Sequence, residues 1–479
     1  MSSKSEYKGK WWIPSDSPNE IDGTLKINSE GTGSLEIRGE LIQQDFSEFP
    51  PTSEEVEIIL GRASDGSKIT LYNCHLQSTS HSPEGFPTQS FIIQTNLLDV
   101  HFFSKDAISF REVKIEFKHF EYLIKGTRIL IKKSPQDTNI LTINNISSEK
   151  IPFFSVDGFS IKIVIDVHSD VTQFPIRKIT IEEFPYILIE TDIERKYEDF
   201  LKVIDKIQYF FSFCLLKIVY PLEIYAESRA SIWEPPSDWN VKEDNGVIYE
   251  PIKIISHWVD LPDQYERDEV DRNEILFTLN DIRDNSDFIM NKWWIKNEVF
   301  KSVFDIYFGT IFNSKMYLEN TYLSLAQCIE SYHRKSPRFL DYYIHPEEYA
   351  ERIEIVKKTL KNQPELTISQ KKSLISTLKM GNSLSLENRI QQLLITYPTI
   401  TPFIIGSEKN FPNSIALNRN NLTHLDPKPE IKYATFEELY YLSIRMRLLL
   451  ITVFLDELGF EIRNIEKIIL RLSRRNRLK

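Results

Sequence analysis

The periodicity of the apolar residues changes once along this chain, and that change most constrains its fold. Over residues 1–191, short runs alternate apolar and polar side chains, as strands with one buried face do. Ile21–Asn28 and Ser34–Leu41 flank a glycine-bearing turn, which predicts a β-hairpin. Further alternating runs occupy residues 56–60, 67–72, 90–95, 112–117, 159–167 and 177–181. Strands at this spacing predict an antiparallel sandwich-like or barrel-like domain.

From about residue 192 the apolar residues recur every three or four positions, which predicts helices. A first helix covers Tyr197–Phe211, and short β-like stretches follow at residues 217–224 and 247–255. From about Glu274 onward nearly all of the chain has helical periodicity. The predicted helices are residues 289–312, 317–333, 349–360, 368–380, 386–395 and 434–458. Thr435 and Glu438 have capping-box spacing at the start of the last helix, and Gly459 follows its end.

These patterns predict an α+β multidomain chain. We expect a β-rich N-terminal domain over residues 1–191, a mixed helical and β connecting region over 192–313, and an all-helical bundle over 314–479. A chain of 479 residues is too long for one ordinary domain. The pairs Trp11–Trp12 and Trp293–Trp294 are most simply core or interface packing, although aromatic recognition is the alternative.

The composition narrows the classes of function. A formal net charge of −11 argues against a protein that coats nucleic acid, but not against a local basic patch. Cys74, Cys214 and Cys328 lie far apart, so we expect no disulfide framework and no zinc site built from sequence-local pairs. No phosphate-binding loop, calcium loop or other cofactor motif occurs, and we expect neither metal nor cofactor. The longest apolar stretch, residues 207–222, is interrupted by polar residues, and no signal peptide is visible, so we expect a cytoplasmic protein without membrane contact.

Residues 416–427 contain the strongest signal for chemistry. They predict a short helix that Pro427 stops, with His424 near its C-terminal end. Asn420 and His424 are four positions apart and share a face, and the long side chain of Arg419 reaches the same edge. RNA can be cleaved by attack of its own 2′-hydroxyl on the neighbouring phosphate. A histidine can move protons near neutral pH, and an arginine can stabilise the charge that builds on the phosphate. An asparagine can orient either of them or donate a hydrogen bond to a phosphate oxygen.

The run Arg419-Asn420-x-x-x-His424, followed by residues 435–459, resembles the HEPN superfamily and, more narrowly, its ApeA-like members of bacterial anti-phage defence by abortive infection. The stretch 326–334 is similar to the helix that carries a glutamate in that subfamily, and the glutamate here is Glu330. The resemblance covers about residues 314–458, and the β-rich part is similar in layout only.

This resemblance implies a helical bundle that forms a homodimer and cleaves RNA, specifically tRNA, without a metal. Two copies of the motif then share one composite cleft. It implies that His424 is the acid and base, that Arg419 stabilises the phosphate, that Asn420 supports them, and that Glu330 belongs to the same catalytic site. It also implies activation by a phage component, such as a phage protein, that the β-rich region senses.

The same residues also allow simpler interpretations. Arg419 and His424 fit a surface helix whose last histidine stabilises only the helix dipole. A catalytically inactive HEPN dimer that acts as a sensing and binding module is therefore the alternative function. Glu330 and Arg334 are four positions apart and fit a plain surface ion pair equally well. The C-terminal tail, residues 461–479, has seven basic and two acidic residues and is either an RNA-binding segment or a frayed end.

Overall fold

Two units make up the computed structural model of the chain, residues 1–287 and residues 288–479. Residues 192–287 of the expected connecting region thus fold with the strands, and residues 288–313 fold with the helices. The structure describes residues 5–15, 18–43, 55–81, 86–124, 129–133, 141–145, 150–171, 179–232, 249–258, 269–313, 315–408, 410–424 and 430–478. The predicted α+β class is confirmed.

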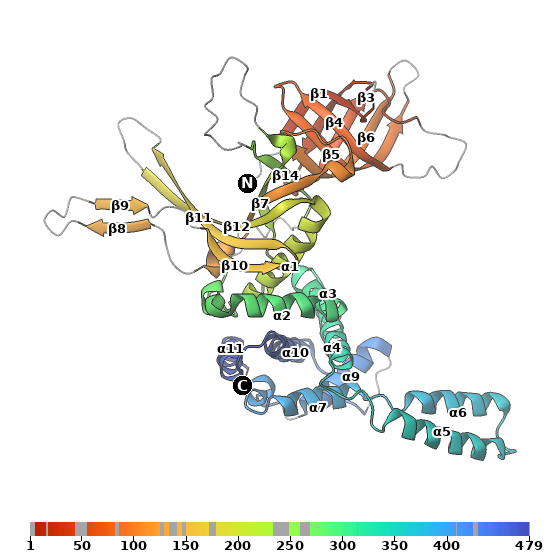
Figure 1. Cartoon of the computed structure of the whole chain (residues 1–479). Coiled ribbons are helices and arrows are strands. Elements are labelled where there is room, and N and C mark those ends of the chain that lie inside the picture. Colours follow the sequence, from red (N-terminus) through yellow and green to blue (C-terminus); the bar gives the residue numbers. More distant parts are fainter. Residues whose placement is uncertain are drawn as a thin grey trace. The chain divides into compact units, whose positions relative to one another are not determined.

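Six antiparallel strands at the N-terminal end close into a barrel (Figure 1). They are β1 (Ser5–Trp12), β2 (Ile21–Ile27), β3 (Gly33–Arg38), β4 (Glu55–Ala63), β5 (Lys68–Ser80) and β6 (Thr88–Leu98). Their order is β6-β3-β2-β1-β4-β5, and the pairing of β5 with β6 closes the ring. The predicted β2–β3 hairpin is confirmed, and β1 is a strand that the alternating runs did not predict.

The alternation of apolar and polar residues explains how the barrel interior is filled, because each strand points every second side chain inward. Along β3, buried and exposed residues alternate without exception. The interior is filled by Trp11, Leu25, Leu35, Ile37, Ile59, Leu71, Phe91 and Ile93. Gly61 leaves the room that Trp11 needs, since a Cβ atom at Gly61 would lie 2.2 Å from the Trp11 ring. Trp11 is therefore a core residue, as its simpler interpretation predicted.

A second set of six antiparallel strands continues the sheet from the barrel. They are β10 (Ile151–Val156), β11 (Phe159–Val171), β12 (Ile179–Lys196), β7 (Ser109–Phe117), β13 (Pro221–Glu227) and β14 (Ile252–Ser256), in that spatial order. The pairing of β14 with β6 joins this sheet to the barrel. A separate two-stranded ribbon is formed by β8 (Ile129–Lys133) and β9 (Leu141–Asn145). The predicted run 177–181 begins outside the described residues.

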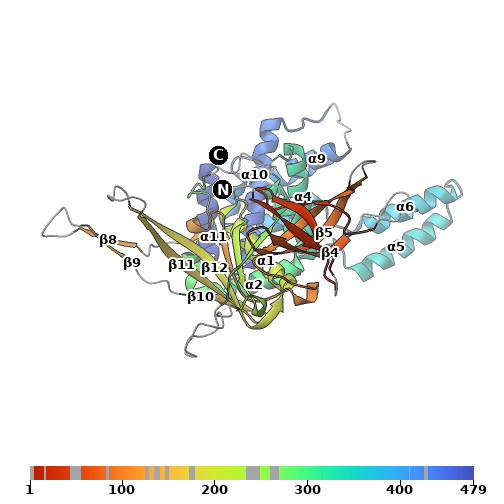
Figure 2. The same ribbon diagram turned by 90° about the horizontal axis from the view of Figure 1, so that it is seen from above.

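Helix α1 (Tyr197–Leu215) lies against this second sheet (Figure 2), and aromatic residues make the contact. The ring centroids of Phe200 and Phe159 are 5.2 Å apart, and those of Phe211 and Phe117 are 5.5 Å apart. The change of periodicity occurs at Tyr197 rather than near residue 192, because β12 continues to Lys196.

The second unit is helical. Its helices are α2 (Ser286–Val299, whose first two residues belong to the first unit), α3 (Lys301–Phe312), α4 (Leu318–Lys335), α5 (Pro346–Lys361), α6 (Ile368–Met380), α7 (Leu386–Thr396), α8 (Thr401–Ile405), α9 (Phe411–His424), α10 (Phe436–Glu457) and α11 (Ile462–Arg475). The prediction of one helix over residues 289–312 is wrong, since the chain breaks at Phe300 between α2 and α3. Phe300 is fully buried, and its ring lies 5.2 Å from that of Tyr332 on α4.

Helix α10 forms the centre of this unit, with most of its residues buried. Its predicted ends are confirmed. The Thr435 hydroxyl accepts a hydrogen bond from the Glu438 amide (3.3 Å), and the Glu438 carboxylate accepts one from the Thr435 amide (2.7 Å). Gly459 has a φ of +86°, the left-handed backbone that ends many helices.

Two features of the helical unit extend beyond the bundle core. Helices α5 and α6 form a hairpin that projects from the other helices (Figures 1 and 2). Ile353 is the one buried residue of the pair. The basic C-terminal tail is not frayed over its described part, because residues 462–475 form α11. No helix among the described residues is long and apolar enough to cross a bilayer.

Candidate active site

Helix α9 places the predicted motif on its outer side and packs its other side into the bundle. Its buried residues are Phe411, Ile415 and Asn418. The Tyr322 hydroxyl of α4 donates a hydrogen bond to the Ile415 carbonyl oxygen at 3.0 Å. Asn418 accepts a hydrogen bond from the Ala434 amide at 2.8 Å, just before α10 begins. Helix α9 thus packs against α4 and α7, and the segment just before α10 is hydrogen-bonded to it.

Arg419 is half-buried and lies between two oxygen acceptors. Its Nη2 atom is 3.3 Å from Glu330 Oε2 on α4, and its Nη1 atom is 3.2 Å from Asn420 Oδ1. The other oxygen of Glu330 accepts a hydrogen bond from Arg334 Nη2 at 2.8 Å. The Glu330 carboxylate therefore makes the expected ion pair with Arg334 and also contacts the arginine of the motif.

His424 is the last residue of α9, and it is exposed. It makes no hydrogen bond or ion pair with any described residue. The predicted helix stop at Pro427 lies outside the described residues. The structure thus brings Arg419, Asn420 and Glu330 into direct contact, and it leaves the His424 imidazole open to solvent one helical turn beyond Asn420.

Two residues that support this site were not predicted. Asn418 fixes α9 by accepting a hydrogen bond from the Ala434 amide, and Tyr322 fixes it to α4. The helical period places Asn418 on the inner side of α9. A buried amide needs hydrogen-bond partners, so this position could have indicated a structural role. Tyr322 is one of the buried residues of α4, and its hydroxyl could not be assigned a partner from the sequence.

His333, also on the Glu330 helix, has a different role. It is fully buried, and Arg389 Nη1 lies 3.1 Å from its Nδ1 atom, while Gln392 Oε1 lies 2.8 Å from its Nε2 atom. A guanidinium group can only donate, so Nδ1 accepts, and Nε2 carries the proton that it donates to Gln392. His333 is therefore held as a neutral structural residue.

Burial is the largest effect on His333 and lowers its pKa below the usual value of 6.5. The hydrogen bond with Gln392 opposes this shift, the charge of Arg389 adds to it, and the charge of Asp341 opposes it. The unfolded chain therefore takes up a proton at a higher pH than the folded chain. We expect the free energy of unfolding to fall as the pH drops below about 6.5. Urea unfolding followed by circular dichroism at a series of pH values measures this.

The variant His333→Gln is the control for this pH dependence. An amide can accept from Arg389 and donate to Gln392 as the neutral imidazole does, but it does not titrate. Between about pH 6.5 and 5 the variant should lose less stability than the parent. Equal losses in the two proteins would show that His333 does not contribute.

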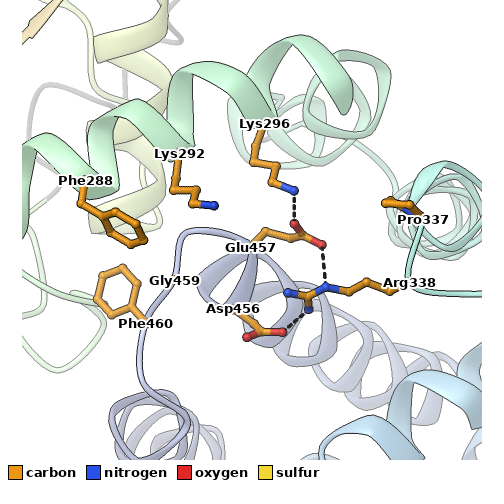
Figure 3. A pocket seen from close by; sticks show the side chains of 9 residues that line it. All are labelled: Phe288, Lys292, Lys296, Pro337, Arg338, Asp456, Glu457, Gly459 and Phe460. Atoms are coloured by element: carbon orange, nitrogen blue, oxygen red, sulfur yellow. Dashed lines mark hydrogen bonds and ion pairs between the residues drawn. The ribbon is translucent and has the colours of Figure 1, made fainter.

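A pocket of about 380 Å³ lies elsewhere in the helical unit, at the end of α10 (Figure 3). Glu457 is almost fully buried there, and it receives Lys296 Nζ at 2.5 Å and the Tyr332 hydroxyl at 2.8 Å. Arg338 pairs with the neighbouring Asp456. This network holds α10 to α2 and to the turn after α4, and no residue of the Arg419 motif lines the pocket. Among the described residues, no group of three or more His, Cys, Asp or Glu side chains is arranged to hold a metal ion.

Comparisons with known families agree with this arrangement. A family model described as ApeA N-terminal domain 1 matches residues 6–293, and one described as Apea-like HEPN matches residues 323–463. The second match includes Glu330 and the whole of α9. No curated protein and no solved structure matches the chain. The resemblance noted from the sequence is confirmed, and the chain belongs to the ApeA family of HEPN-domain proteins.

Proposed function

We propose that this chain is a metal-independent endoribonuclease of bacterial anti-phage defence, and that Arg419, Asn420 and His424 form its active centre with the help of Glu330. The observation that carries the proposal is the contrast along α9. Arg419 is held by Glu330 and Asn420, whereas His424 is exposed and has no partner among the described residues. A proton-transfer group must be accessible, and a phosphate-binding group must be positioned.

Arg419 has donors left for a phosphate. A guanidinium carries five N–H groups, and the contacts with Glu330 and Asn420 use two of them. The others can hydrogen-bond the non-bridging oxygens as negative charge builds on the phosphate. Glu330 is a positioning residue in this scheme, because it acts on the substrate through Arg419.

The reaction is transesterification within the RNA strand. The 2′-oxygen forms a bond to phosphorus, the bond from phosphorus to the 5′-oxygen breaks, and the products are a 2′,3′-cyclic phosphate and a 5′-hydroxyl. One proton leaves the 2′-hydroxyl and one is added to the leaving 5′-oxygen. A single imidazole cannot hold both positions at once, so a homodimer that brings two copies of His424 to one cleft completes the site.

The family supports the wider role that we propose. HEPN domains are generally ribonucleases, and the match to the ApeA family models supports a role in abortive-infection defence. We propose tRNA as the substrate, the cytoplasm as the location, and a phage component as the trigger. In this proposal the β-rich unit, residues 1–287, senses that trigger, and the helical unit, residues 288–479, cuts the RNA.

A substrate without the attacking hydroxyl tests the chemistry. We expect a tRNA transcript to be cleaved to products with a cyclic phosphate end, and a version with 2′-deoxyribose at the cleaved nucleotide to lose at least about a hundredfold in rate, because 2′-oxygen attack is then impossible. EDTA should change the rate by less than about twofold. Gel analysis of end-labelled RNA measures both. Full cleavage of the deoxy substrate, or loss of cleavage in EDTA, would instead indicate a metal-dependent nuclease.

A further inference from the structure

The outer side of α11 carries a row of cations. Arg463, Lys467, Arg471 and Arg474 follow one another at four, four and three positions, which places them on one side of the helix at intervals of about 5–6 Å. We call these four residues the α11 basic row. All four are exposed. Among the described residues, Arg463, Lys467 and Arg474 have no ion-pair partner.

The opposite side of α11 packs against the rest of the helical unit. Ile465, Ile469 and Leu472 are buried, and α11 packs with them against α10 and α8. The row is therefore presented on a fixed helix. Insertion into a bilayer needs a free apolar face, and a protein interface needs an apolar or aromatic centre. The basic row offers only charge, which suits a regular chain of phosphates better than either.

We propose that the α11 basic row binds the phosphate backbone of RNA and holds it on the helical unit. The chain as a whole carries a net charge of −11 and repels RNA, so a local concentration of cations has to supply the attraction. This inference rests on the proposed function, because it takes RNA as the substrate. It adds a second RNA-binding surface, separate from Arg419 and His424.

The position of α11 determines how long an RNA must be to contact both the basic row and the α9 motif. Helix α10 lies between α11 and α9 in Figures 1 and 2. Helix α11 packs against α10 and α8, whereas α9 packs against α4 and α7, so the row and the α9 motif lie on helices that are not packed against each other. An RNA of a few nucleotides cannot contact both. The row should therefore strengthen the binding of long RNA and leave the shortest substrates unaffected.

Salt-dependent binding of an uncleavable probe tests this inference. The probes are fluorescein-labelled 2′-O-methyl RNAs of about 30 and about 4 nucleotides, and the test variant of the full chain is Arg463→Gln/Lys467→Gln/Arg474→Gln. Arg471 stays unchanged because it makes interactions within the fold. We expect the Kd for the long probe to rise roughly 10–100-fold near 0.1 M salt, and the slope of log Kd against log salt to fall by about two.

The matched control is Lys301→Gln/Arg352→Gln/Lys357→Gln. It removes the same number of charges, but each of these cations is paired with a neighbouring carboxylate. The control and the variant Arg463→Lys/Arg474→Lys should bind the long probe within about twofold of the parent, because the row keeps its charge in both. None of the changes should affect the short probe.

Several outcomes would overturn the inference. One is a row variant that binds the long probe as tightly as the control does. Another is a parent that binds anionic lipid vesicles through the row but does not bind RNA. The two proposals fail separately. If the parent binds the probe through the row but never cleaves RNA, the inference stands and the nuclease assignment fails. If the parent cleaves RNA and the row variant matches the control, the nuclease stands and the row does not.

Discussion

Replacement of His424 by alanine is expected to lower the rate of RNA cleavage by about 10²–10⁴-fold, the usual contribution of a general acid or base. Arg419→Ala should cost on the order of 10²–10³-fold, as loss of a donor to a developing charge does. Neither change should alter the fold, because His424 is exposed and Arg419 is only half-buried at the surface of α9. Quantified cleavage of tRNA by the purified triggered protein, and survival of cells that express it, measure the two effects.

His345→Ala is the matched control for His424→Ala. His345 is also exposed and lies at a helix terminus, as the N-cap residue of α5, but it is far from Arg419 in sequence. Its side chain lies near Glu347 and the Tyr342 ring. Its replacement should leave cleavage within about twofold of the parent. Arg419→Lys should cleave RNA faster than Arg419→Ala but more slowly than the parent, because lysine keeps the positive charge but lacks the planar guanidinium group. A His424→Ala protein that cleaves tRNA as fast as the parent would leave the inactive sensing dimer as the better assignment.

Replacement of Arg389 by methionine is expected to destabilise the helical unit by about 2–4 kcal/mol, because buried acceptors lose their donor. Arg389 is fully buried, and its Nε atom donates to the Leu384 carbonyl oxygen at 3.1 Å. Its Nη2 atom donates to Ser383 Oγ at 3.1 Å and pairs with Asp341, and Nη1 donates to His333. Methionine has a similar length but no donor. Urea unfolding of the full chain, followed by its helical circular dichroism, measures the loss.

The role of Arg389 is to join segments that are distant in sequence. Asp341 precedes the α5–α6 hairpin, Ser383 follows it, and His333 lies on the helix that carries Glu330. The matched control is Arg352→Met on α5, where the arginine is exposed and paired only with Glu348, and the expected loss is below about 0.5 kcal/mol. If both variants are equally stable, the buried arginine is not the anchor that its contacts indicate.

The α9 motif could be predicted because its residues are adjacent. Arg419, Asn420 and His424 lie within six positions, and helical geometry alone relates their side chains. Glu330 is 89 positions away from Arg419, and only the family resemblance indicated it. Asn418 was missed because the partner that it fixes, Ala434, belongs to another segment.

The sequence by itself determined the class of each unit, the ends of α10 and the helix that carries the motif, because alternation, helical spacing and capping residues act between neighbours in the chain. Only the tertiary structure decided that β5 and β6 close a barrel, that Phe300 interrupts a helix to pack on Tyr332, and that Glu330 reaches Arg419. It also decided that the basic tail is a packed helix with an open row of cations. These outcomes depend on contacts between residues far apart in the chain, which the packing of buried surfaces selects and no local pattern encodes.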